Sequence, residues 1–354
     1  MRTHDIALIP GDGIGKEVVE AAMLVLRKAA EQGGFTLEET VYPWSCDSYL
    51  ETGRMMPEDG IEQLRRHDSI LLGAVGWPEK VPDSVSLHGL LLPIRKAFDL
   101  YVNMRPHRLL PGVTGPLRAT DFDILCIREN TEGEYSGAGG RVHSGSPAEV
   151  AVETSIFTRR GVERILRYGF EQARARRGKL ASVTKSNAQR HGMVFWDAVF
   201  EEVRKDYPDV ETDKMLVDAM TTRMVLNPKS LDTIVATNLH ADVLSDLAAA
   251  LTGSLGIAPT GNLRPEKDFP SMFEPIHGSA FDIIGKGVAN PIGCFWSGAM
   301  MLEHLGEKAA ADRLMAAVAR VTGSREAVSP DLGGDATTRQ VTDAVLAAVR
   351  GAND

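Results

Sequence analysis

Two aspartates one helical turn apart stand out in the stretch Asn238–Ala250, NLHADVLSDLAAA. If this stretch is helical, Asp242 and Asp246 project from the same face, because residues four apart are neighbours on a helix surface. Like charges at this spacing repel, so a cation is expected between them, and a divalent metal is the simplest candidate. The alternative is a solvated acidic face. Apolar neighbours such as Leu239 and Val243 leave little surface for that alternative and favour a metal site.

Three predicted strands end in polar residues, namely Lys185, Asp218 and Asn238. In open parallel sheets, ligands bind beyond the carboxyl ends of the strands, so these side chains are well placed for chemistry. Each one alone is more often an ordinary loop residue. Lys185 and Tyr135 have groups suited to proton transfer if neighbouring charge lowers their pKa, and they are the candidate base and acid.

Three arginines, Arg95, Arg105 and Arg128, lie in or beside apolar segments. A guanidinium group forms paired hydrogen bonds with a carboxylate, so such a set suits a small di- or tricarboxylate, although each arginine alone is more typical of a surface. No His or Cys cluster has zinc spacing, and oxygen ligands suit Mg²⁺ or Mn²⁺. Bound to a 2-hydroxy acid, such a metal would stabilise the alkoxide and later the enolate.

The chain has 354 residues, of which 43% are hydrophobic and 25% charged, an ordinary globular composition. A formal net charge of −9 without a basic run disfavours nucleic-acid and anionic-membrane partners. No apolar run approaches the roughly 20 residues of a membrane span, and the N-terminus has no signal-peptide core. Cys46, Cys126 and Cys294 show no CxxC pairing and are typical of reduced thiols, so we expect a cytoplasmic protein.

Alternating strands and helices must position these residues. Asp5–Pro10 is a predicted strand, followed by the turn GDGIG and a helix from about Lys16 to Gln32. The glycines are spaced GxGxG, whereas the dinucleotide fingerprint requires GxGxxG, so the motif predicts a tight turn at a crevice. The alternation predicts an α/β fold with a parallel-rich sheet flanked by helices and without the usual Rossmann fingerprint.

Other segments carry weaker signals. We expect a helix led by Pro57, a loop or an arm between strands at 137–147, and a long helix from Thr158. The segment GSLGIAPTGN is rich in turn residues, and FEPIHGSAFDIIGKGVANP is expected to be long and irregular before an apolar helix at 292–305.

Together the motifs resemble the β-decarboxylating dehydrogenases, the family of isopropylmalate, isocitrate, D-malate and tartrate dehydrogenases. The similarity runs from Ile6 to the C-terminus, through PGDGIG, MRPHRLLPG, RENTEGEYSG, TKSN, NLHADVLSD and EPIHGSA with GKGVANP. It implies an isopropylmalate dehydrogenase-like two-domain fold, with a cofactor-side domain at 1–99 plus 252–354. Residues 100–251 would form the substrate, metal and dimerisation domain, with an arm around 136–157.

The resemblance also implies a role for each candidate. Tyr135 would be the general acid for the enol, and Lys185 the general base. The implied substrate-binding residues are Arg95, Arg105, Arg128, His88, Leu91 and Asn187. The implied ligands of Mn²⁺ or Mg²⁺ are Asp218, Asp242 and Asp246. Lys185 and Asp218 would come from the partner subunit, so each active site is expected to need a homodimer; activation by a monovalent cation such as K⁺ is left open.

The cofactor implied by the resemblance is NAD, lying against the segment from Glu274 to Asn290. The implied contacts are Glu274, His277, Gly278, Ser279, Asp282 and Asn290. A carboxylate at Asp282 can accept hydrogen bonds from ribose hydroxyls and would repel a 2′-phosphate, so NAD is favoured over NADP.

The expected reaction is NAD-dependent oxidation and metal-assisted decarboxylation of tartrate or D-malate, the latter to pyruvate and CO₂. Isopropylmalate enzymes have Glu at the position of His88, and isocitrate enzymes have Ser and Asn at the positions of Gly89 and Leu91. This chain has neither pattern, and segments such as GAVGWPEKVPDSVSLHG are most similar to the D-malate and tartrate members. The leucines at 90–92 keep 3-isopropylmalate open as the second substrate.

An alternative of another class is a non-catalytic protein that binds a metal and a carboxylate on the same scaffold. Binding alone does not require Tyr135 or Lys185, and both are present.

Overall fold

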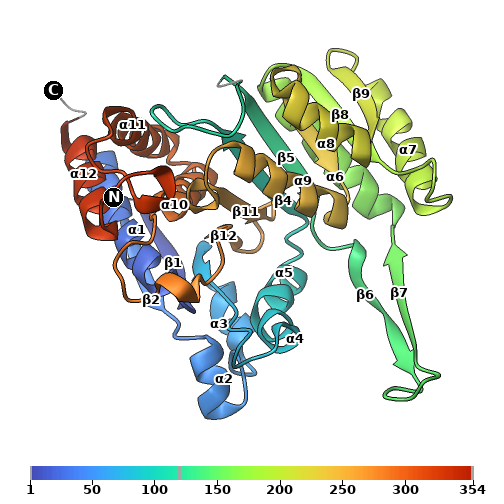
Figure 1. Cartoon of the computed structure of the whole chain (residues 1–354), viewed down its shortest axis with the longest axis horizontal. Coiled ribbons are helices and arrows are strands. Elements are labelled where there is room, and N and C mark those ends of the chain that lie inside the picture. Colours follow the sequence, from blue (N-terminus) through green and yellow to red (C-terminus); the bar gives the residue numbers. More distant parts are fainter. Residues whose placement is uncertain (1, 119–120, 352–354) are drawn as a thin grey trace. The chain divides into compact units, whose positions relative to one another are not determined.

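The computed structural model describes residues 2–118 and 121–351, and the chain divides into two units (Figure 1). Unit 1 consists of residues 1–100, 109–120 and 249–354, and unit 2 of residues 101–108 and 121–248. In each unit a group of mostly parallel strands is flanked by helices, so the predicted α/β class is confirmed. Within the described residues, no helix combines the length and apolarity needed to cross a membrane.

Unit 1 has five strands in the order β2, β1, β3, β12, β11. Their bounds are β1 (Arg2–Gly11), β2 (Phe35–Val41), β3 (Ser69–Ala74), β11 (Pro259–Leu263) and β12 (Ser271–Pro275). All neighbours are parallel except β11 and β12, which are antiparallel. The sequence predicts turns or irregular structure over β11 and β12, which is wrong. Every residue of both strands is buried, so neither shows the alternation that identifies a half-exposed strand.

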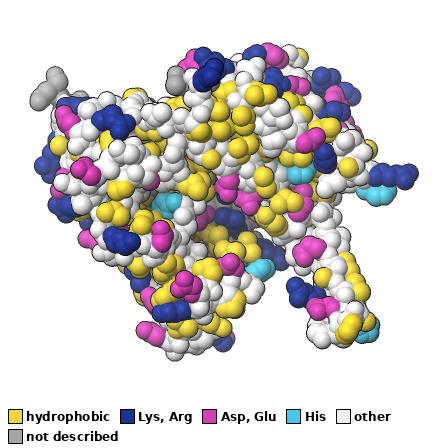
Figure 2. All heavy atoms as spheres, in the orientation of Figure 1, with side chains coloured by type: hydrophobic (Ala, Val, Ile, Leu, Met, Phe, Trp, Pro, Cys, Tyr) yellow, Lys and Arg dark blue, Asp and Glu magenta, His cyan; other side chains and the backbone are white. Residues whose placement is uncertain are grey.

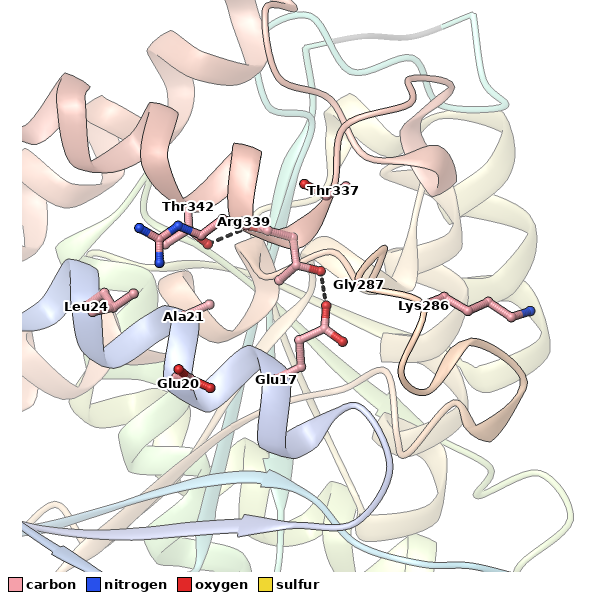
Figure 3. A pocket seen from close by; sticks show the side chains of 10 residues that line it. Glu17, Glu20, Ala21, Leu24, Lys286, Gly287, Thr337, Arg339 and Thr342 are labelled. Atoms are coloured by element: carbon pink, nitrogen blue, oxygen red, sulfur yellow. Dashed lines mark hydrogen bonds between the residues drawn. The ribbon is translucent and has the colours of Figure 1, made fainter.

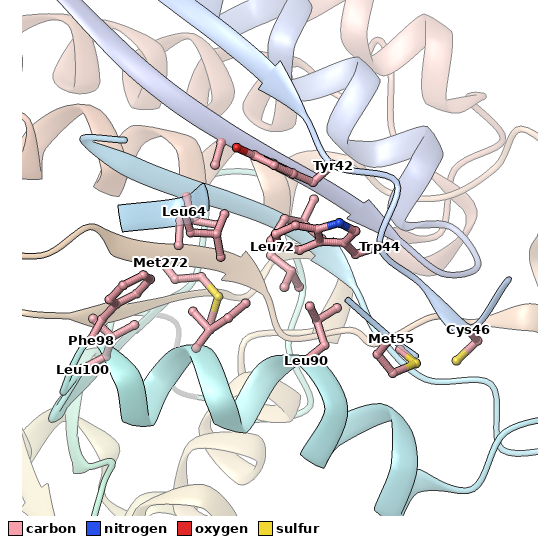
Figure 4. Close-up of a cluster of buried hydrophobic side chains, with 14 of the residues drawn as sticks. Tyr42, Trp44, Cys46, Met55, Leu64, Leu72, Leu90, Phe98, Leu100 and Met272 are labelled. Carbon is pink, nitrogen blue, oxygen red and sulfur yellow. The ribbon is translucent and has the colours of Figure 1, made fainter. Parts of the chain in front are cut away.

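Helices cover both faces of these strands. On one face α1 (Gly15–Gly33) and α10 (Ile292–His304) pack on the strands, and α11 (Lys308–Ser324) and α12 (Thr338–Arg350) pack against those two helices. On the other face, strand residues such as Ile9 and Leu72 form a buried cluster with Leu64 and Leu90, which are in helices, and with Phe98, which directly follows one (Figure 4).

The other helical elements of unit 1 are short. They are α2 (Cys46–Thr52), α3 (Gly60–Arg65), α4 (Asp83–Ser86), the π-helix η1 (Leu87–Leu91), α5 (Leu92–Ala97) and the 3₁₀ turns η4 (Leu255–Ile257), η5 (Phe281–Ile283) and η6 (Pro330–Leu332). The predicted helix led by Pro57 is placed too early. The carbonyl of Pro57 accepts the N–H of Gly60 at 3.0 Å in a turn, and α3 begins only after that turn.

Among the described residues of unit 2, five strands pair in the order β4, β5, β10, β8, β9. Their bounds are β4 (Val102–Arg108), β5 (Asp123–Glu129), β8 (Lys179–Thr184), β9 (Glu211–Leu216) and β10 (Thr233–Ala236). Only β4 and β5 are antiparallel neighbours. The helical elements are α6 (Arg159–Ala175), α7 (Gly192–Val203), η2 (Arg204–Asp206), α8 (Val217–Leu226), η3 (Pro228–Ser230) and α9 (Asn238–Leu251). The carboxyl ends of β8 and β10 therefore lead to Lys185 and to Asn238.

An antiparallel hairpin, β6 (Gly133–Val142) with β7 (Val150–Ile156), forms the arm of unit 2 (Figure 1). The arm carries exposed apolar side chains on both strands, and Figure 2 shows hydrophobic atoms along it. They are Val142, Val150, Val152 and Ile156. Exposed apolar residues gathered on one element are typical of a surface that another chain covers.

One histidine in β4 is buried without a partner. The side chain of His107 is 1% exposed, and neither ring nitrogen has a hydrogen-bond partner among the described residues. Burial, and secondarily the charge of Arg105, lowers the pKa of His107 to about 3. The folded protein therefore holds this imidazole neutral.

We expect the substitution His107→Leu to make the protein less sensitive to acid. The unfolded chain binds a proton at this histidine below about pH 6.5, whereas the folded chain does not until about pH 3. Because the folded-state pKa is depressed, stability is present above pH 6.5 and is lost as the pH falls, at about 1.4 kcal/mol per pH unit. Urea unfolding at pH 7.5 and pH 5 should show a pH-dependent loss about 2 kcal/mol smaller in the variant.

The control for this experiment is His143→Gln, which changes an exposed histidine of the arm. Its pH dependence should match that of the wild type. If His107→Leu also loses as much stability as the wild type between the two pH values, His107 is not the acid-sensitive group.

Candidate active site

The amino end of α9 is held by a carboxylate that the sequence analysis did not single out. Glu134 accepts a hydrogen bond from the hydroxyl of Thr237 at 2.9 Å and another from the backbone N–H of Leu239 at 3.1 Å. A carboxylate is favoured here because the first N–H groups of a helix have no partner within the helix and carry partial positive charge. The only sequence signal was its position in the RENTEGEYSG motif.

Asp242 and Asp246 lie on one face of α9, as predicted, and the cation between them is Arg105. Its Nη1 atom is 3.4 Å from Oδ1 of each aspartate. Arg128 also pairs with Asp242 through its own Nη1. The pKa of Asp246 is raised, first by partial burial of the carboxyl group and then by the charge of Asp242, while Arg105 opposes both.

Both guanidinium groups are buried and have polar partners on α9. Arg128, 4% exposed, donates from Nε and Nη2 to Oδ1 of Asn238 at 2.9 and 2.7 Å. Arg105, 7% exposed, donates from Nη1 to the hydroxyl of Ser245 at 2.7 Å. Charge-assisted hydrogen bonds of this kind compensate for the loss of water around a buried cation.

The expectation that apolar neighbours would enclose the aspartate pair is wrong. Val243 is 56% exposed and Leu239 is 36% exposed, so one side of α9 presents apolar side chains at the surface of the chain. The aspartates are not a freely solvated face either, because the two arginines hold them.

The phenol of Tyr135 lies beside this group. Its hydroxyl donates to Oδ2 of Asp242 at 3.3 Å, and the guanidinium carbon of Arg128 lies 5.6 Å from its ring centroid. Partial burial, followed by the charge of Asp242, raises the pKa of Tyr135. The sequence analysis required a lowered pKa, so that condition is wrong for this residue. A raised pKa keeps the phenol protonated at neutral pH and suits a proton donor.

Lys185 and Asp218 form a separate pair. The ammonium group of Lys185, in the turn after β8, donates to Oδ1 of Asp218 at 2.5 Å. This hydrogen bond lowers the pKa of Asp218, which lies in the first turn of α8. Two of the three predicted metal ligands are thus brought together within the chain and the third is not. Across residues 2–118 and 121–351, no three His, Cys, Asp or Glu side chains are grouped to hold a metal.

Unit 1 pairs a predicted substrate residue with a predicted cofactor residue. Arg95 donates from Nη2 to Oε1 of Glu274 at 3.0 Å, and Glu274 also accepts from the amide of Asn262 at 2.8 Å. The Nε atom of Arg95 is buried without a partner among the described residues. This arginine can therefore still donate to a ligand that reaches it.

The remaining predicted substrate residues lie on the surface of elements. His88 is exposed and Leu91 is half-buried, and both lie on the π-helix η1. π-Helices are rare in proteins, and those that occur are frequently found at functional sites. Asn187 is exposed in the turn after β8.

The predicted cofactor loop contains buried polar atoms that lack partners. Nε2 of His277 and Oγ of Ser279 have no hydrogen-bond partner among the described residues. Nδ1 of His277 lies 2.8 Å from the carbonyl of Gly278, and burial lowers the pKa of this histidine. Asp282 is exposed on η5. Unpaired buried donors and acceptors are costly, so they fit a polar ligand such as a dinucleotide.

Asn290 has a structural task in addition to any contact with a cofactor. Its Oδ1 accepts the N–H of Ile292 at the start of α10 at 3.0 Å, and its Nδ2 donates to Asp331 at 2.9 Å. Asp331 was not foreseen from the sequence, because only the fold brings it to Asn290.

Asp12 was also not foreseen as a key residue. It is 2% exposed, and its two carboxylate oxygens accept the N–H groups of Cys46 at 2.8 Å and Gly76 at 2.9 Å. It therefore joins the turns that follow β1, β2 and β3. The available sequence signal for Asp12 was its position between two glycines directly after a predicted strand.

A cavity of about 410 Å³ lies between α1, Lys286–Gly287 and the start of α12 (Figure 3). Glu17 accepts a hydrogen bond from the hydroxyl of Thr338 within it. None of the predicted site residues lines this cavity. This cavity therefore does not mark the predicted site.

We expect the substitution Asn238→Ala to destabilise the protein by about 3 kcal/mol, because Arg128 loses two charge-assisted hydrogen bonds while it stays buried. Urea unfolding at neutral pH measures the change. Ala250→Ser, on the exposed side of the same helix, is the control and should change stability by less than about 0.5 kcal/mol. A loss equal to that of the control would mean that Asn238 does not support Arg128.

Comparisons with known proteins assign the chain to a family. The isocitrate/isopropylmalate dehydrogenase family matches residues 5–345. A probable tartrate dehydrogenase/decarboxylase of Agrobacterium vitis is 60% identical over 100% of this chain and 99% of that protein. The D-malate dehydrogenase [decarboxylating] of Escherichia coli (strain K12) is 51% identical over 98% of each. The crystal structure of isocitrate dehydrogenase from Methylococcus capsulatus has a TM-score of 0.88 at 36% identity, covering 98% of this chain and 99% of that one. The predicted resemblance is confirmed, and the chain belongs to the isocitrate/isopropylmalate dehydrogenase family.

Proposed function

We propose that the protein oxidises and decarboxylates a small 2-hydroxy dicarboxylate, tartrate or D-malate, with NAD as the oxidant and Mn²⁺ or Mg²⁺ as the metal. The observation that carries the proposal is the pair of buried arginines, Arg105 and Arg128, which hold the carboxylate of Asp242 beside the phenol of Tyr135. The names of relatives from Agrobacterium vitis and Escherichia coli, at 60% and 51% identity, support this substrate class.

The arginines bind the substrate in this proposal. Each already pairs with a carboxylate of its own chain, Arg105 and Arg128 with Asp242 and Arg95 with Glu274. A substrate carboxylate can replace such a partner, because the buried guanidinium keeps a charge-assisted hydrogen bond throughout. Guanidinium groups of this kind would favour a dicarboxylate over a neutral hydroxy compound.

Two side chains move protons. Lys185 accepts the proton of the substrate hydroxyl as the hydroxyl is oxidised to a carbonyl. After CO₂ leaves, Tyr135 gives its phenolic proton to the carbon of the enol. The raised pKa of Tyr135 supports this role, because the phenol is protonated when the enol forms.

The residues fit both groups that the family uses. For the cofactor, the buried, unpartnered Nε2 of His277 and Oγ of Ser279 would bind NAD, with Asp282 beside them. For the metal, Asp242 and Asp246 offer oxygen ligands on one face of α9, the type that Mg²⁺ and Mn²⁺ prefer. When bound, NAD would accept the hydride, and the cation would withdraw electron density from the substrate oxygen.

A homodimer would complete the site. Lys185 and Asp218 pair with each other, apart from the group around Asp242, which fits their serving the site of a partner subunit. Exposed apolar residues support a partner surface on unit 2. Besides those of the arm, they are Val225 and Leu226 on α8 and Leu239 and Val243 on α9.

Two other functions remain as outcomes to be tested. In the first, 3-isopropylmalate is the substrate, which the half-buried side chains of Leu91 and Leu92 would accommodate, whereas Leu90 lies in the buried core. In the second, the chain binds a metal and a carboxylate without turnover. The phenol placed against Asp242 speaks against the second, because binding alone does not require a proton donor there.

We expect NADH to form from D-malate and from at least one tartrate isomer, only with Mn²⁺ or Mg²⁺ present, and far more slowly with NADP. NADH absorbance is measured with D-malate, each tartrate isomer and 3-isopropylmalate, with and without metal and with and without K⁺. The highest kcat/KM with 3-isopropylmalate would overturn the substrate assignment. Calorimetric binding of D-malate and Mn²⁺ without any NADH would favour the non-catalytic alternative.

The shared site is tested with mixed dimers of two inactive variants, Lys185→Met and Asp246→Asn. If Lys185 serves the partner's aspartates, one of the two sites in each heterodimer contains only wild-type residues. We therefore expect about half of the wild-type kcat in heterodimers purified through two different tags. Wild-type chains carrying the same tags are the control, and inactive heterodimers beside active controls would refute the exchange.

A further inference from the structure

An aromatic stack joins two loops of unit 1. The rings of Trp77 and Phe281 are parallel to within 16°, with centroids 4.7 Å apart. The ammonium group of Lys80 lies 3.5 Å from the centroid of the Trp77 ring. Because Phe281 covers one face of the indole, the ammonium must lie on the other. The protein thus places a contact on each face of the indole.

The two rings come from segments far apart in the sequence. Trp77 follows β3 in a turn in which its carbonyl accepts the N–H groups of Lys80 at 2.9 Å and Val81 at 2.8 Å. Phe281 begins η5, inside the loop that the proposed function assigns to the dinucleotide. The turn is closed by its own hydrogen bonds, so it can act as a fixed base for the loop.

A second contact anchors the same loop. The carbonyl of Ser279 accepts the N–H of Ile14 at 2.9 Å. A Cβ atom at Gly13 would lie 1.9 Å from that carbonyl, so only glycine allows this approach. Between the two anchors, Ala280 adopts a φ of 39°, which is disfavoured for a residue with a side chain. Such a conformation persists only where surrounding contacts enforce it.

The side chains proposed to contact the dinucleotide flank these anchors directly. Ser279, with its unpartnered buried hydroxyl, lies two residues before Phe281, and Asp282 follows Phe281. Loss of the ring stack would release the Asp282 side of the loop while the Ser279 anchor remains. The stack thus determines where the hydroxyl and the carboxylate stand relative to each other.

We infer that Trp77, supported by Lys80, is a positioning residue for dinucleotide binding that acts through Phe281 and holds the loop from Ser279 to Asp282 in its binding conformation. This inference rests on the proposed use of NAD. Trp77 does not touch the reacting atoms. Its removal should weaken dinucleotide binding and leave the chemical step intact.

The test uses the full-length protein with Trp77→Ala, Trp77→Phe and Phe281→Ala. An aromatic stack is worth about a factor of ten in an equilibrium constant, so Trp77→Ala should raise the Kd for NADH and the KM for NAD about tenfold. At saturating NAD, kcat and the KM for D-malate should stay within about twofold of the wild type. Trp77→Phe retains a ring and should restore most of the affinity. The variant that combines Trp77→Ala with Phe281→Ala should bind NADH no more weakly than Phe281→Ala alone, because the two residues act as one unit.

Two further variants keep the test decisive. Lys80→Met changes an exposed residue without risk to folding and should raise the Kd for NADH about twofold to fourfold. Tyr207→Ala removes a matched stack in unit 2, where Tyr207 and Phe170 lie 4.7 Å apart at 14°. This control should lower the Tm without changing the Kd for NADH.

The outcomes separate the inference from the proposed function. If the wild type binds NADH and Trp77→Ala binds it equally well while folded, the inference is wrong and the proposed function stands. If kcat falls with the Kd unchanged, Trp77 does not position the loop. If the wild type binds neither NADH nor NADPH, the proposed function fails and the inference fails with it.

Discussion

The positive charges of Arg105 and Arg128 are the constraint on which unit 2 depends. Both guanidinium groups are buried, and an arginine cannot lose its proton inside a protein. A buried charge without partners costs several kcal/mol, so the chain has to supply acceptors wherever β4 and β5 place these side chains. The face of α9 that begins at Asn238 supplies them, together with Asn103 on β4. The rotation of α9 about its axis is therefore set by hydrogen bonding as much as by its apolar side.

The same constraint connects folding to function. Asp242 is the partner of both arginines, so under the proposed function a substrate carboxylate that binds them would compete with Asp242. The released aspartate would then be free to act as a metal ligand. Under the proposed function, one side chain thus alternates between stabilising the empty site and serving the loaded one. The phenol of Tyr135 donates a hydrogen bond to the same carboxylate, so its hydrogen bonding would change when Asp242 leaves the arginines.

Features that depend on residues close in the sequence could be predicted. A four-residue spacing places Asp242 and Asp246 on one face of any helix, and the strand before Asn238 ends where its apolar run ends. Features that depend on distant partners could not. Nothing near Asp242 reveals that Arg105, over a hundred residues earlier, lies between the aspartates. The pairing of Arg95 with Glu274 and of Asn290 with Asp331 was hidden for the same reason.

The errors in predicted secondary structure and burial have a related cause. β11 and β12 are buried on both faces, so their short segments carry no alternation, and Pro259, Gly261 and Pro275 resemble turn residues. The opposite error occurred on α9, where Leu239 and Val243 were expected to be enclosed and are exposed. A hydrophobic pattern predicts that a residue is buried. It does not indicate whether the residue is buried by its own chain or by another chain.

The turn GDGIG shows how a short motif can be interpreted through what fills the space around it. In the dinucleotide fingerprint, glycines allow the backbone to approach a pyrophosphate. Here a Cβ at Gly11 would lie 1.9 Å from the carbonyl of Ala74, and one at Gly15 would lie 2.3 Å from the carbonyl of Pro10. The space made by these glycines is occupied by protein backbone, and that made by Gly13 is occupied by the loop at Ser279. Under the proposed function, a dinucleotide would therefore rely on that loop rather than on the turn, and the backbone and aromatic contacts of the loop would hold it in place.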